Sequence, residues 1–180
     1  MKILSIIFDG FEEEEAMAPF ALIRRAGLDL TIASYKSVVK GCHNIELSNI
    51  TLLKDINIKD FDMLIVPGGP HYKFIESNKE ILDIIKYFFD NDKFVAGICA
   101  APTIFGHLGY LKGKNYTCFK SMDSDFGGNY LGYGAFIDGK LITATSVAYS
   151  IDFAYQIIKA ISGDTLLKQV QDHIYYEEKK

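Results

Sequence analysis

The sequence predicts an α/β protein built on a mostly parallel sheet with helices on both faces. Apolar runs of strand length alternate along the chain with segments of helical periodicity. The strand runs are apolar almost throughout, which is typical of strands covered on both faces of a sheet. No linker, repeat or low-complexity stretch interrupts the 180 residues, and 49% of them are hydrophobic. We therefore expect a single domain over residues 1–180.

The first half of the chain contains three predicted strands and two predicted helices. Gly27 ends the first helix, because glycine commonly follows the last helical residue. The second helix carries a stripe of apolar residues at positions 81, 84, 85 and 88. In chain order, these elements are the strand 3–8, the helix 12–26, the strands 28–34 and 61–66, and the helix 76–91.

In the second half, a buried strand runs directly into a helix. Residues 94–98 form the strand, and Pro102 suits the first turn of a helix that reaches about residue 111. Asp138-Gly139 is a strong hairpin signal between two apolar runs. The other predicted elements are a strand at 115–119, hairpin strands at 135–137 and 141–144, helices at 148–161 and 165–174, and a polar tail at 175–180.

Composition disfavours several classes of function. The chain has 19 Lys and Arg against 23 Asp and Glu, and the basic residues are scattered, so we expect no nucleic acid partner. The apolar start is interrupted at Asp9, and no later run approaches the roughly 20 residues that cross a bilayer. The three cysteines are few and lack the spacing of a metal site. We expect a soluble cytoplasmic protein with no membrane partner, metal or cofactor.

Chemistry in an open parallel sheet is expected beyond the carboxyl ends of the strands. Three such ends stand out, at residues 9–15, 67–70 and 97–101. Cys99 lies where a strand turns directly into a helix, a strained elbow that can lift a side chain out of the sheet. The adjacent helix N-terminus favours thiolate over thiol. We interpret Cys99 as a candidate nucleophile, with a small buried core cysteine as the alternative.

Four glutamates open the first helix, at positions 12–15. Acidic residues there stabilise the helix dipole, so a solvated first turn accounts for most of them. On a helical projection Glu15 lies in an apolar stripe, while Glu13 and Glu14 lead towards two arginines at the end of the helix. Glu12 is a second candidate for the buried face. A buried carboxyl is costly unless neutral or paired, which makes it a candidate for proton chemistry.

A Glu15–Cys99 pair cannot easily carry two negative charges. At about 4 Å and an effective dielectric near 20, such charges repel by about 4 kcal/mol, roughly three pK units. Either Cys99 stays an inert thiol, or Glu15 keeps its proton and donates a hydrogen bond to the thiolate. The second arrangement is a catalytic pair, formed by a nucleophile and a general acid/base.

Other residues are weaker candidates. Gly68 and Gly69 form either a tight turn or a pair of backbone donors for an oxyanion. His71 could line a pocket mouth as an accessory group, although an ordinary loop histidine is the simpler interpretation. Cys118 could approach the site from the strand after the elbow helix, with core packing as the favoured alternative. His43 stands in a polar loop whose sequence suggests no ligand set.

The first-helix glutamate, the Pro67-Gly68-Gly69 turn and the segment Ala96-Gly97-Ile98-Cys99-Ala100-Ala101-Pro102 together resemble the ThiJ/PfpI superfamily. The resemblance covers nearly the whole chain and implies a flavodoxin-like three-layer sandwich that forms a homodimer. It also implies that Cys99 is the nucleophile, Glu15 its protonated partner, and the backbone amides of Gly69 and Ala100 an anion pocket. Members are reported as glyoxalases or deglycases acting on α-oxoaldehydes, as cysteine peptidases, as chaperones and as oxidation sensors.

Two departures from the family pattern bear on activity. Peptidase-type members carry a histidine directly after the nucleophile, whereas this chain has Ala100, which disfavours a cysteine peptidase or hydrolase. The deglycase-type branch often has a histidine on the following strand, where this chain has Cys118. The expected function is a cysteine-dependent glyoxalase or deglycase acting on a small-molecule aldehyde. The alternatives are an oxidation-sensing or stress-protective protein without turnover, and a binding module that has lost the chemistry.

Overall fold

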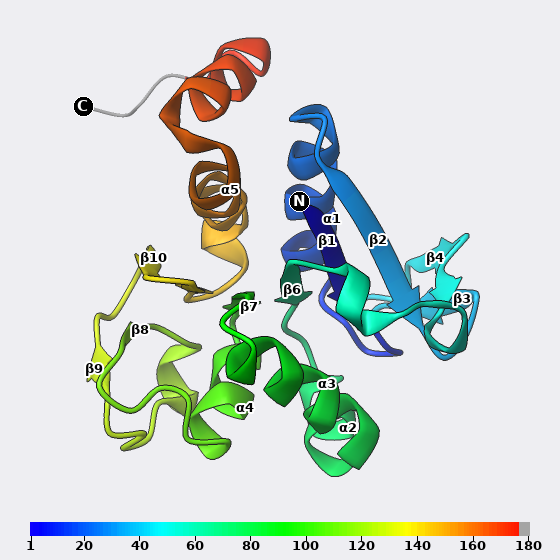
Figure 1. Ribbon diagram of the computed structural model, residues 1–180, viewed down its shortest axis with the longest axis vertical. Coiled ribbons are helices and arrows are strands. Elements are labelled where there is room, and N and C mark those ends of the chain that lie inside the picture. Colours follow the sequence, from blue (N-terminus) through cyan, green and yellow to red (C-terminus); the bar gives the residue numbers. More distant parts are fainter. Residues whose placement is uncertain (177–180) are drawn as a thin grey trace.

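The computed structural model describes residues 1–176. Its main sheet has seven strands and lies at the centre of the molecule (Figure 1). The strand order is β10-β11-β7-β6-β1-β2-β5, and all neighbours are parallel except β10 and β11. The order from β2 to β11 is that of a flavodoxin-like sheet, which confirms the predicted fold class. The strands are β1 (Lys2–Ile6), β2 (Asp29–Ser34), β5 (Thr51–Leu52), β6 (Met63–Val66), β7 (Phe94–Ile98), β10 (Ala135–Asp138) and β11 (Leu141–Ala144).

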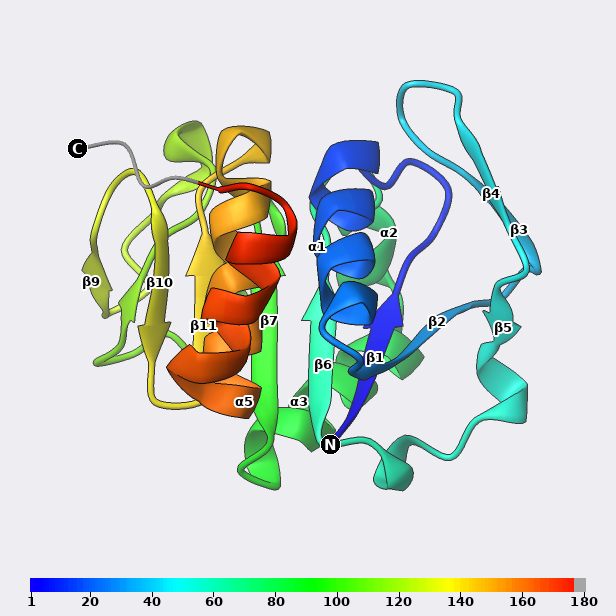
Figure 2. The same cartoon turned by 90° about the horizontal axis from the view of Figure 1, so that it is seen from above.

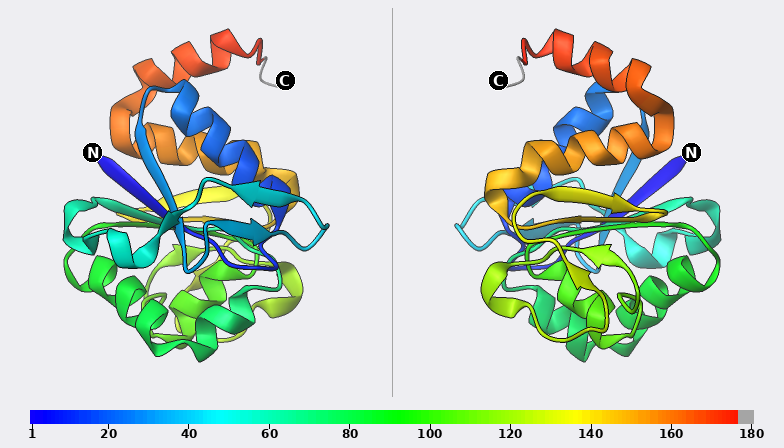
Figure 3. Two further views of the ribbon diagram at one scale, coloured as in Figure 1. Left: turned by 90° about the vertical axis from the view of Figure 1, so that its right-hand side faces the viewer. Right: turned by 90° about the vertical axis from the view of Figure 1, so that its left-hand side faces the viewer.

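Helices cover both faces of this sheet, and Figure 3 shows the three layers from the side. Two helices lie side by side on one face (Figure 2), and three cover the other. The first group is α1 (Glu13–Arg25) and α5 (Ser150–His173), and the second is α2 (Tyr72–Ser77), α3 (Lys79–Asp90) and α4 (Ala101–His107).

Two hydrophobic clusters fill the spaces between the three layers. Successive residues of β1 and the residue after it alternate between them, because side chains of a strand point to opposite faces. Ile3 and Ile7 belong to the cluster under α1 and α5, while Leu4 and Ile6 belong to the cluster over α3 and α4. All four side chains are fully buried, which explains why the strand is apolar almost throughout.

The helix predicted at 76–91 is present as α3, but its predicted start is wrong, because Asn78 separates α3 from the preceding helix α2. Asn78 is extended, with φ −106° and ψ 104°, and its side-chain oxygen accepts the Ile81 N–H at 3.3 Å. Asn78 is therefore the N-cap of α3. The preceding helix α2 ends one residue earlier, at Ser77.

The short elements at the edges were the least predictable. The strand predicted at 115–119 is reduced to two residues, which pair in parallel with a second short strand outside the main sheet. An antiparallel hairpin over residues 38–48 was not predicted, because each of its strands is only three residues long. These elements are β3 (Val38–Lys40), β4 (Glu46–Ser48), β8 (Asn115–Tyr116), β9 (Asn129–Tyr130) and the 3-10 helices η1 (Leu53–Asp55), η2 (Ile58–Asp60), η3 (Lys120–Met122) and η4 (Val147–Tyr149).

The C-terminal elements agree with prediction. Asp138 pairs with Leu141, so the hairpin turns through Gly139, whose φ is +61°. Helix α5 is broken at Gly163, with φ 78° and ψ 179°, between the two helices that were predicted there. Residues 177–180 of the predicted tail lie outside the described residues. No helix in residues 1–176 combines the length and hydropathy needed to cross a membrane.

Candidate active site

Cys99 occupies a strained elbow between β7 and α4. Its φ is +62°, in the left-handed region that residues other than glycine seldom adopt. The backbone is fixed on both sides: the Cys99 N–H donates to the Ala144 carbonyl at 2.9 Å, and the Cys99 carbonyl accepts from the Phe119 N–H at 2.8 Å. Such strain persists only where the surroundings hold it, and it clusters at functional sites. The half-buried Cys99 side chain lines a pocket beyond the strand end.

The first turn of α1 brings Glu15 into the interior. Glu12 is the N-cap of this helix, and its Oε2 accepts the Glu15 N–H at 2.8 Å. The Glu12 N–H donates to the Gly68 carbonyl at 2.9 Å, which holds the start of the helix over the turn after β6. Glu15 is 1% exposed. Of the two glutamates that the sequence left open, Glu15 is therefore the buried one and Glu12 is the cap.

Glu15 and Cys99 converge at Gly68. A Cβ built on Gly68 would lie 2.2 Å from Glu15 Oε2 and 2.6 Å from the Cys99 Cβ. Only a residue without a side chain leaves room for these two groups to meet. The structure thus brings together the two side chains singled out in the sequence, one from the start of α1 and the other from the end of β7.

The electrostatics of the pair are set by burial. Burial raises the pKa of Glu15 to about 7, and the nearby Glu12 carboxylate raises it further. The hydrogen bond with Cys99 acts in the opposite direction and lowers this pKa. The backbone N–H groups of Gly68 and Val147 also lower it. Burial, and then an ionised Glu15, raise the pKa of Cys99 above that of a free thiol. The helix N-terminus alone therefore does not make Cys99 acidic, contrary to the sequence-based expectation, and thiolate is favoured only when Glu15 is protonated.

Two backbone N–H groups face the Cys99 sulfur. They belong to Gly69 and Ala100, and both lower the pKa of Cys99. Neither donates to a backbone carbonyl in the turns and loops of the described chain, so both are available to an anion. Gly69 has φ +97°, and a Cβ there would lie 2.4 Å from the Glu12 nitrogen, so only glycine fits.

A small pocket, here called the elbow pocket, opens beside the sulfur with a volume of about 260 Å³. Its lining contains no histidine. The lining includes Lys73, which was not a candidate in the sequence because it lies in α2, a helix that was not predicted. A larger open groove of about 630 Å³ runs along α3, and its lining contains no cysteine. The elbow pocket is lined by Gly69, Pro70, Tyr72, Lys73, Cys99, Ala100, Phe119 and Met122.

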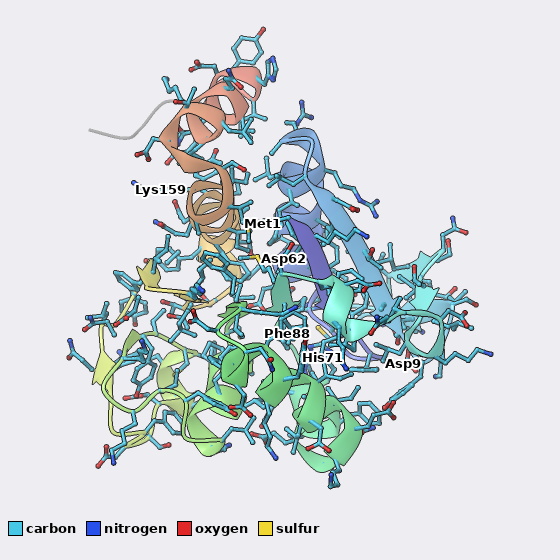
Figure 4. The ribbon with its side chains drawn as sticks, in the orientation of Figure 1. Met1, Asp9, Asp62, His71, Phe88 and Lys159 are labelled. Carbon is cyan, nitrogen blue, oxygen red and sulfur yellow. The ribbon has the colours of Figure 1, made fainter. Side chains whose placement is uncertain are left out.

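His71 supports the turn and does not line the elbow pocket. Its Nε2 lies 2.8 Å from the Pro67 carbonyl, and its Nδ1 accepts the Phe8 N–H at 3.3 Å, so the ring is neutral with its proton on Nε2. Burial lowers the pKa of His71 to about 4, despite the hydrogen bond to Pro67. The His71 N–H donates to the Gly10 carbonyl at 3.1 Å, and Figure 4 shows His71 near Asp9 at this end of the sheet.

Neither Cys118 nor Glu13 lines the elbow pocket. Cys118 is fully buried in the cluster over α3 and α4, where burial and then Asp123 raise its pKa to about 12. Cys118 therefore packs in the core, which was the favoured interpretation of this residue in the sequence. Glu13, expected on the outer face of α1, is instead 5% exposed. Its carboxylate accepts backbone N–H groups of the β3–β4 loop, which the sequence could not place.

The fold and these side chains define an α/β protein with a thiol at a strand-to-helix elbow and a buried carboxyl beside it. The family model described as DJ-1/PfpI family matches residues 1–160. The chain therefore belongs to the DJ-1/PfpI family, which confirms the ThiJ/PfpI resemblance seen in the sequence.

Known relatives agree with this assignment. An uncharacterized protein of Methanocaldococcus jannaschii is 30% identical over 171 residues, which cover 89% of this chain and 82% of that protein. Deglycase PfpI of Pyrococcus furiosus is 28% identical over 148 residues, covering 80% of this chain and 89% of that protein. The crystal structure of Drosophila melanogaster DJ-1beta matches with a TM-score of 0.89 and 26% identity, over 98% of this chain and 100% of that chain.

Proposed function

We propose that this protein is a cysteine-dependent enzyme with glyoxalase- or deglycase-type chemistry on small α-oxoaldehydes. The observation that carries the proposal is the convergence of the Cys99 thiol, the Glu15 carboxyl and two available backbone N–H groups at one edge of the sheet. The deglycase names of several relatives support the substrate class. The volume of the elbow pocket is suited to a substrate of a few heavy atoms.

In this proposal the pair shares one proton, which rests on Glu15 while Cys99 is a thiolate. Glu15 Oε2 is buried, and no nitrogen or oxygen donor in the described chain satisfies it. An ionised carboxylate with an unsatisfied buried oxygen is costly, whereas a protonated one can donate to the neighbouring sulfur. The thiolate in turn receives the N–H groups of Gly69 and Ala100. In this proposal, the proton of Glu15 and these two N–H groups offset the burial that raises the pKa of Cys99, so the sulfur is nucleophilic only while Glu15 stays protonated.

The first step is addition of sulfur to the aldehyde carbon of a substrate such as methylglyoxal. A carbon–sulfur bond forms while the carbonyl π bond breaks, and the oxygen becomes an alkoxide. The N–H groups of Gly69 and Ala100 are placed to stabilise that charge. The alkoxide then takes the proton of Glu15, which gives a hemithioacetal and leaves a carboxylate ready to act as a base.

The second step moves two protons within the substrate. The Glu15 carboxylate removes the proton from the carbon bonded to sulfur, and the electron pair of that C–H bond moves towards the neighbouring ketone to give an enediol, in which the ketone oxygen takes up the hydroxyl proton of the hemithioacetal. Glu15 then returns its proton to the former ketone carbon, which becomes a CHOH group, while the carbon bonded to sulfur regains a carbonyl. The aldehyde carbon is oxidised to a thioester while the ketone carbon is reduced, so no external oxidant is needed. Water then cleaves the thioester, which releases a 2-hydroxy acid and returns the proton and the thiolate. Lys73 in the elbow pocket supplies positive charge for the product carboxylate.

The test is turnover of methylglyoxal by the purified wild-type protein, Cys99→Ser and Cys42→Ser. Cys42 is, like Cys99, a half-buried free thiol, so the two variants lose an equal share of simple thiol scavenging. We expect release of lactate by wild type and Cys42→Ser, and a loss of at least about a hundredfold in Cys99→Ser. Equal rates in all three proteins would refute the proposal.

A second candidate function is oxidation sensing without turnover. It is favoured by the half-buried Cys99 with a carboxyl beside it, while Cys118 is fully buried. Peroxide would transfer one oxygen to the sulfur to give sulfenic acid and water, and a second peroxide would give sulfinic acid. Intact mass after mild peroxide should then rise by two oxygens, confined to Cys99. Earlier oxidation of Cys42 or Cys118 would remove the basis for this function.

The homodimer and the cytoplasmic location implied by the sequence stay predictions. Light scattering on the purified protein tests the first, and fractionation of cells that express the chain tests the second.

A further inference from the structure

A second group of reactive side chains lies outside the elbow pocket, and we call it the loop cluster. Two members stand at the start of α1, and two belong to the loop between β3 and β4. One ligand atom from each member lies within 4.8 Å of the ligand atom of every other member. The members of the loop cluster are Glu12, Glu13, Cys42 and His43.

The two carboxylates of the loop cluster are held by backbone donors. Glu12 Oε2 accepts the Glu15 N–H at 2.8 Å, while Glu13 Oε1 accepts the N–H groups of His43 at 2.8 Å and Ile45 at 3.2 Å. Each carboxylate thus has one oxygen fixed and the other available. A backbone hydrogen bond to the far oxygen is the kind of outer contact that orients a metal ligand.

The available atoms face the thiol and the imidazole. Glu12 Oε1 lies 3.5 Å from His43 Nε2, and the Cys42 thiol lies 3.6 Å from Glu13 Oε2. The four ligand atoms comprise two oxygens, a nitrogen and a sulfur. Sequence spacing gave no ligand set here, because the carboxylates and the loop come from positions about thirty residues apart.

The loop is fixed against the helix by its own backbone. The Cys42 N–H donates to the Phe11 carbonyl at 2.8 Å. A Cβ built on Gly41 would lie 2.3 Å from Glu13 Oε1, so glycine at this position lets the loop close over the carboxylate. These contacts hold the loop against α1, where the four ligand atoms lie within 4.8 Å of one another.

Charge at the loop cluster is not balanced by lysine or arginine. Among the ion pairs of residues 1–176, Glu12 pairs with His43, and neither glutamate pairs with a lysine or arginine. Glu13 is buried, whereas His43 is exposed, so the cluster has a closed and an open side. A cation entering from the open side would find two negative oxygens already in place.

We propose that the loop cluster is a binding site for a divalent ion of the zinc class. A thiolate, an imidazole and two carboxylates are a four-ligand set suited to tetrahedral Zn²⁺, whereas Ca²⁺ and Mg²⁺ prefer oxygen ligands alone. On binding, the Cys42 thiol releases its proton to solvent and the metal–sulfur bond replaces the S–H bond. No oxidation or reduction takes place.

The experiment uses Co²⁺ as a spectroscopic probe on the full chain after removal of metals with a chelator. Thiolate coordination to Co²⁺ produces charge-transfer absorption in the near ultraviolet. We expect one equivalent of Co²⁺ to produce this band in wild type and in Cys99→Ser, and Zn²⁺ to displace it. Cys42→Ser should lose the band. A band that survives in Cys42→Ser, or that disappears in Cys99→Ser, would overturn the assignment.

A second variant keeps the test independent of the thiol. His43→Gln should weaken Co²⁺ binding by more than about tenfold, as expected for loss of a ligand. The matched control is His107→Gln, which changes another exposed histidine that is paired with a carboxylate, Glu76. Zn²⁺ should raise the melting temperature of wild type and of His107→Gln, and it should raise the melting temperature of His43→Gln by less. Equal Co²⁺ affinity in the two histidine variants would contradict the site.

Discussion

Glu15 faces Cys99 across a position that carries no side chain. The glycine between them, Gly68, does not have a positive φ, so its backbone conformation is open to any residue. Space alone requires glycine there, since a Cβ would lie 2.2 Å from Glu15 Oε2. The contact between Glu15 and Cys99, on which the proposed chemistry depends, therefore requires that no methyl group be present at position 68.

Gly68→Ala is expected to separate the pair and lower kcat/KM for methylglyoxal by up to about a hundredfold, because small displacements of a catalytic group are that costly. The free energy of unfolding should fall by only about 1–3 kcal/mol, the usual cost of an extra methyl group in a packed site. Steady-state kinetics and urea unfolding measure the two effects. Wild-type kcat/KM in a folded Gly68→Ala protein would show that the pair is not used.

The position of the shared proton is tested by alkylation of Cys99 with iodoacetamide as a function of pH. Glu15→Gln keeps a neutral donor beside the sulfur, so the midpoint should stay within roughly half a unit of wild type, whereas Glu15→Leu should raise it by about one unit or more. Turnover should be lost in both variants, because neither side chain can shuttle a proton. A midpoint that falls by two or three units in Glu15→Gln would mean that wild-type Glu15 is ionised and Cys99 is protonated.

Glu15 also predicts a dependence of stability on pH. Its folded-state pKa is raised to about 7, so the native state binds more protons than the unfolded state between its ordinary pKa and 7. The resulting stabilisation is fully present below the unfolded pKa and is lost as pH rises through about 7, by up to about 3 kcal/mol. Urea unfolding at pH 5 and pH 8 should show this loss in wild type relative to Glu15→Gln. A constant difference between the two proteins would contradict the raised pKa.

His71 predicts a slope of the opposite sign. Its folded-state pKa is lowered to about 4, so its stabilisation is present above the unfolded pKa near 6.5 and is lost as pH falls through 4, by up to about 3 kcal/mol. His71→Gln should be less stable at pH 7 by about 1–2 kcal/mol, because one of two backbone hydrogen bonds is lost, but it should lack this acid loss. The comparison of wild type with the variant is needed, since Glu15 and His71 offset each other between about pH 4.5 and 6.5. If His71→Gln lost as much unfolding free energy in acid as wild type does, that loss would belong to other groups.

Cys118→Ala tests whether Cys118 is only a packing residue. We expect kcat/KM and the alkylation profile of Cys99 to be unchanged, with a small loss of about 1 kcal/mol in the free energy of unfolding. Activity assays and urea unfolding on the same preparation check this. A tenfold loss of turnover in the folded variant would restore Cys118 as an accessory group.

The central fold could be predicted because its signals are local. β1, β6 and β7 are apolar almost throughout, and Gly27 and Pro102 mark the end and the start of helices. The division of the 76–91 helix was missed because neither glycine nor proline interrupts the segment. Asn78 is a residue type preferred at N-caps, and its extended backbone and its hydrogen bond to Ile81 show that it is one.

The candidate site was only partly predictable. Helical periodicity placed both Glu12 and Glu15 towards the interior, and the choice between them depends on the capping contact at the start of α1. Burial of Glu13 could not be anticipated, because its partners lie in a loop about thirty residues away. The approach of the Val147 backbone N–H to Glu15 could not be anticipated either, because Val147 belongs to the segment after β11.

The two backbone hydrogen bonds of Cys99 tie two distant stretches of chain to this residue, one through Ala144 and the other through Phe119. Phe119 also lines the elbow pocket, so the residue that shapes the pocket wall also holds the backbone of Cys99. If the proposed function holds, grafting a foreign loop over residues 117–122 to broaden the range of aldehydes would also disturb the backbone that positions Cys99. Met122 is the safer place for redesign, since its side chain borders the cavity without anchoring the elbow.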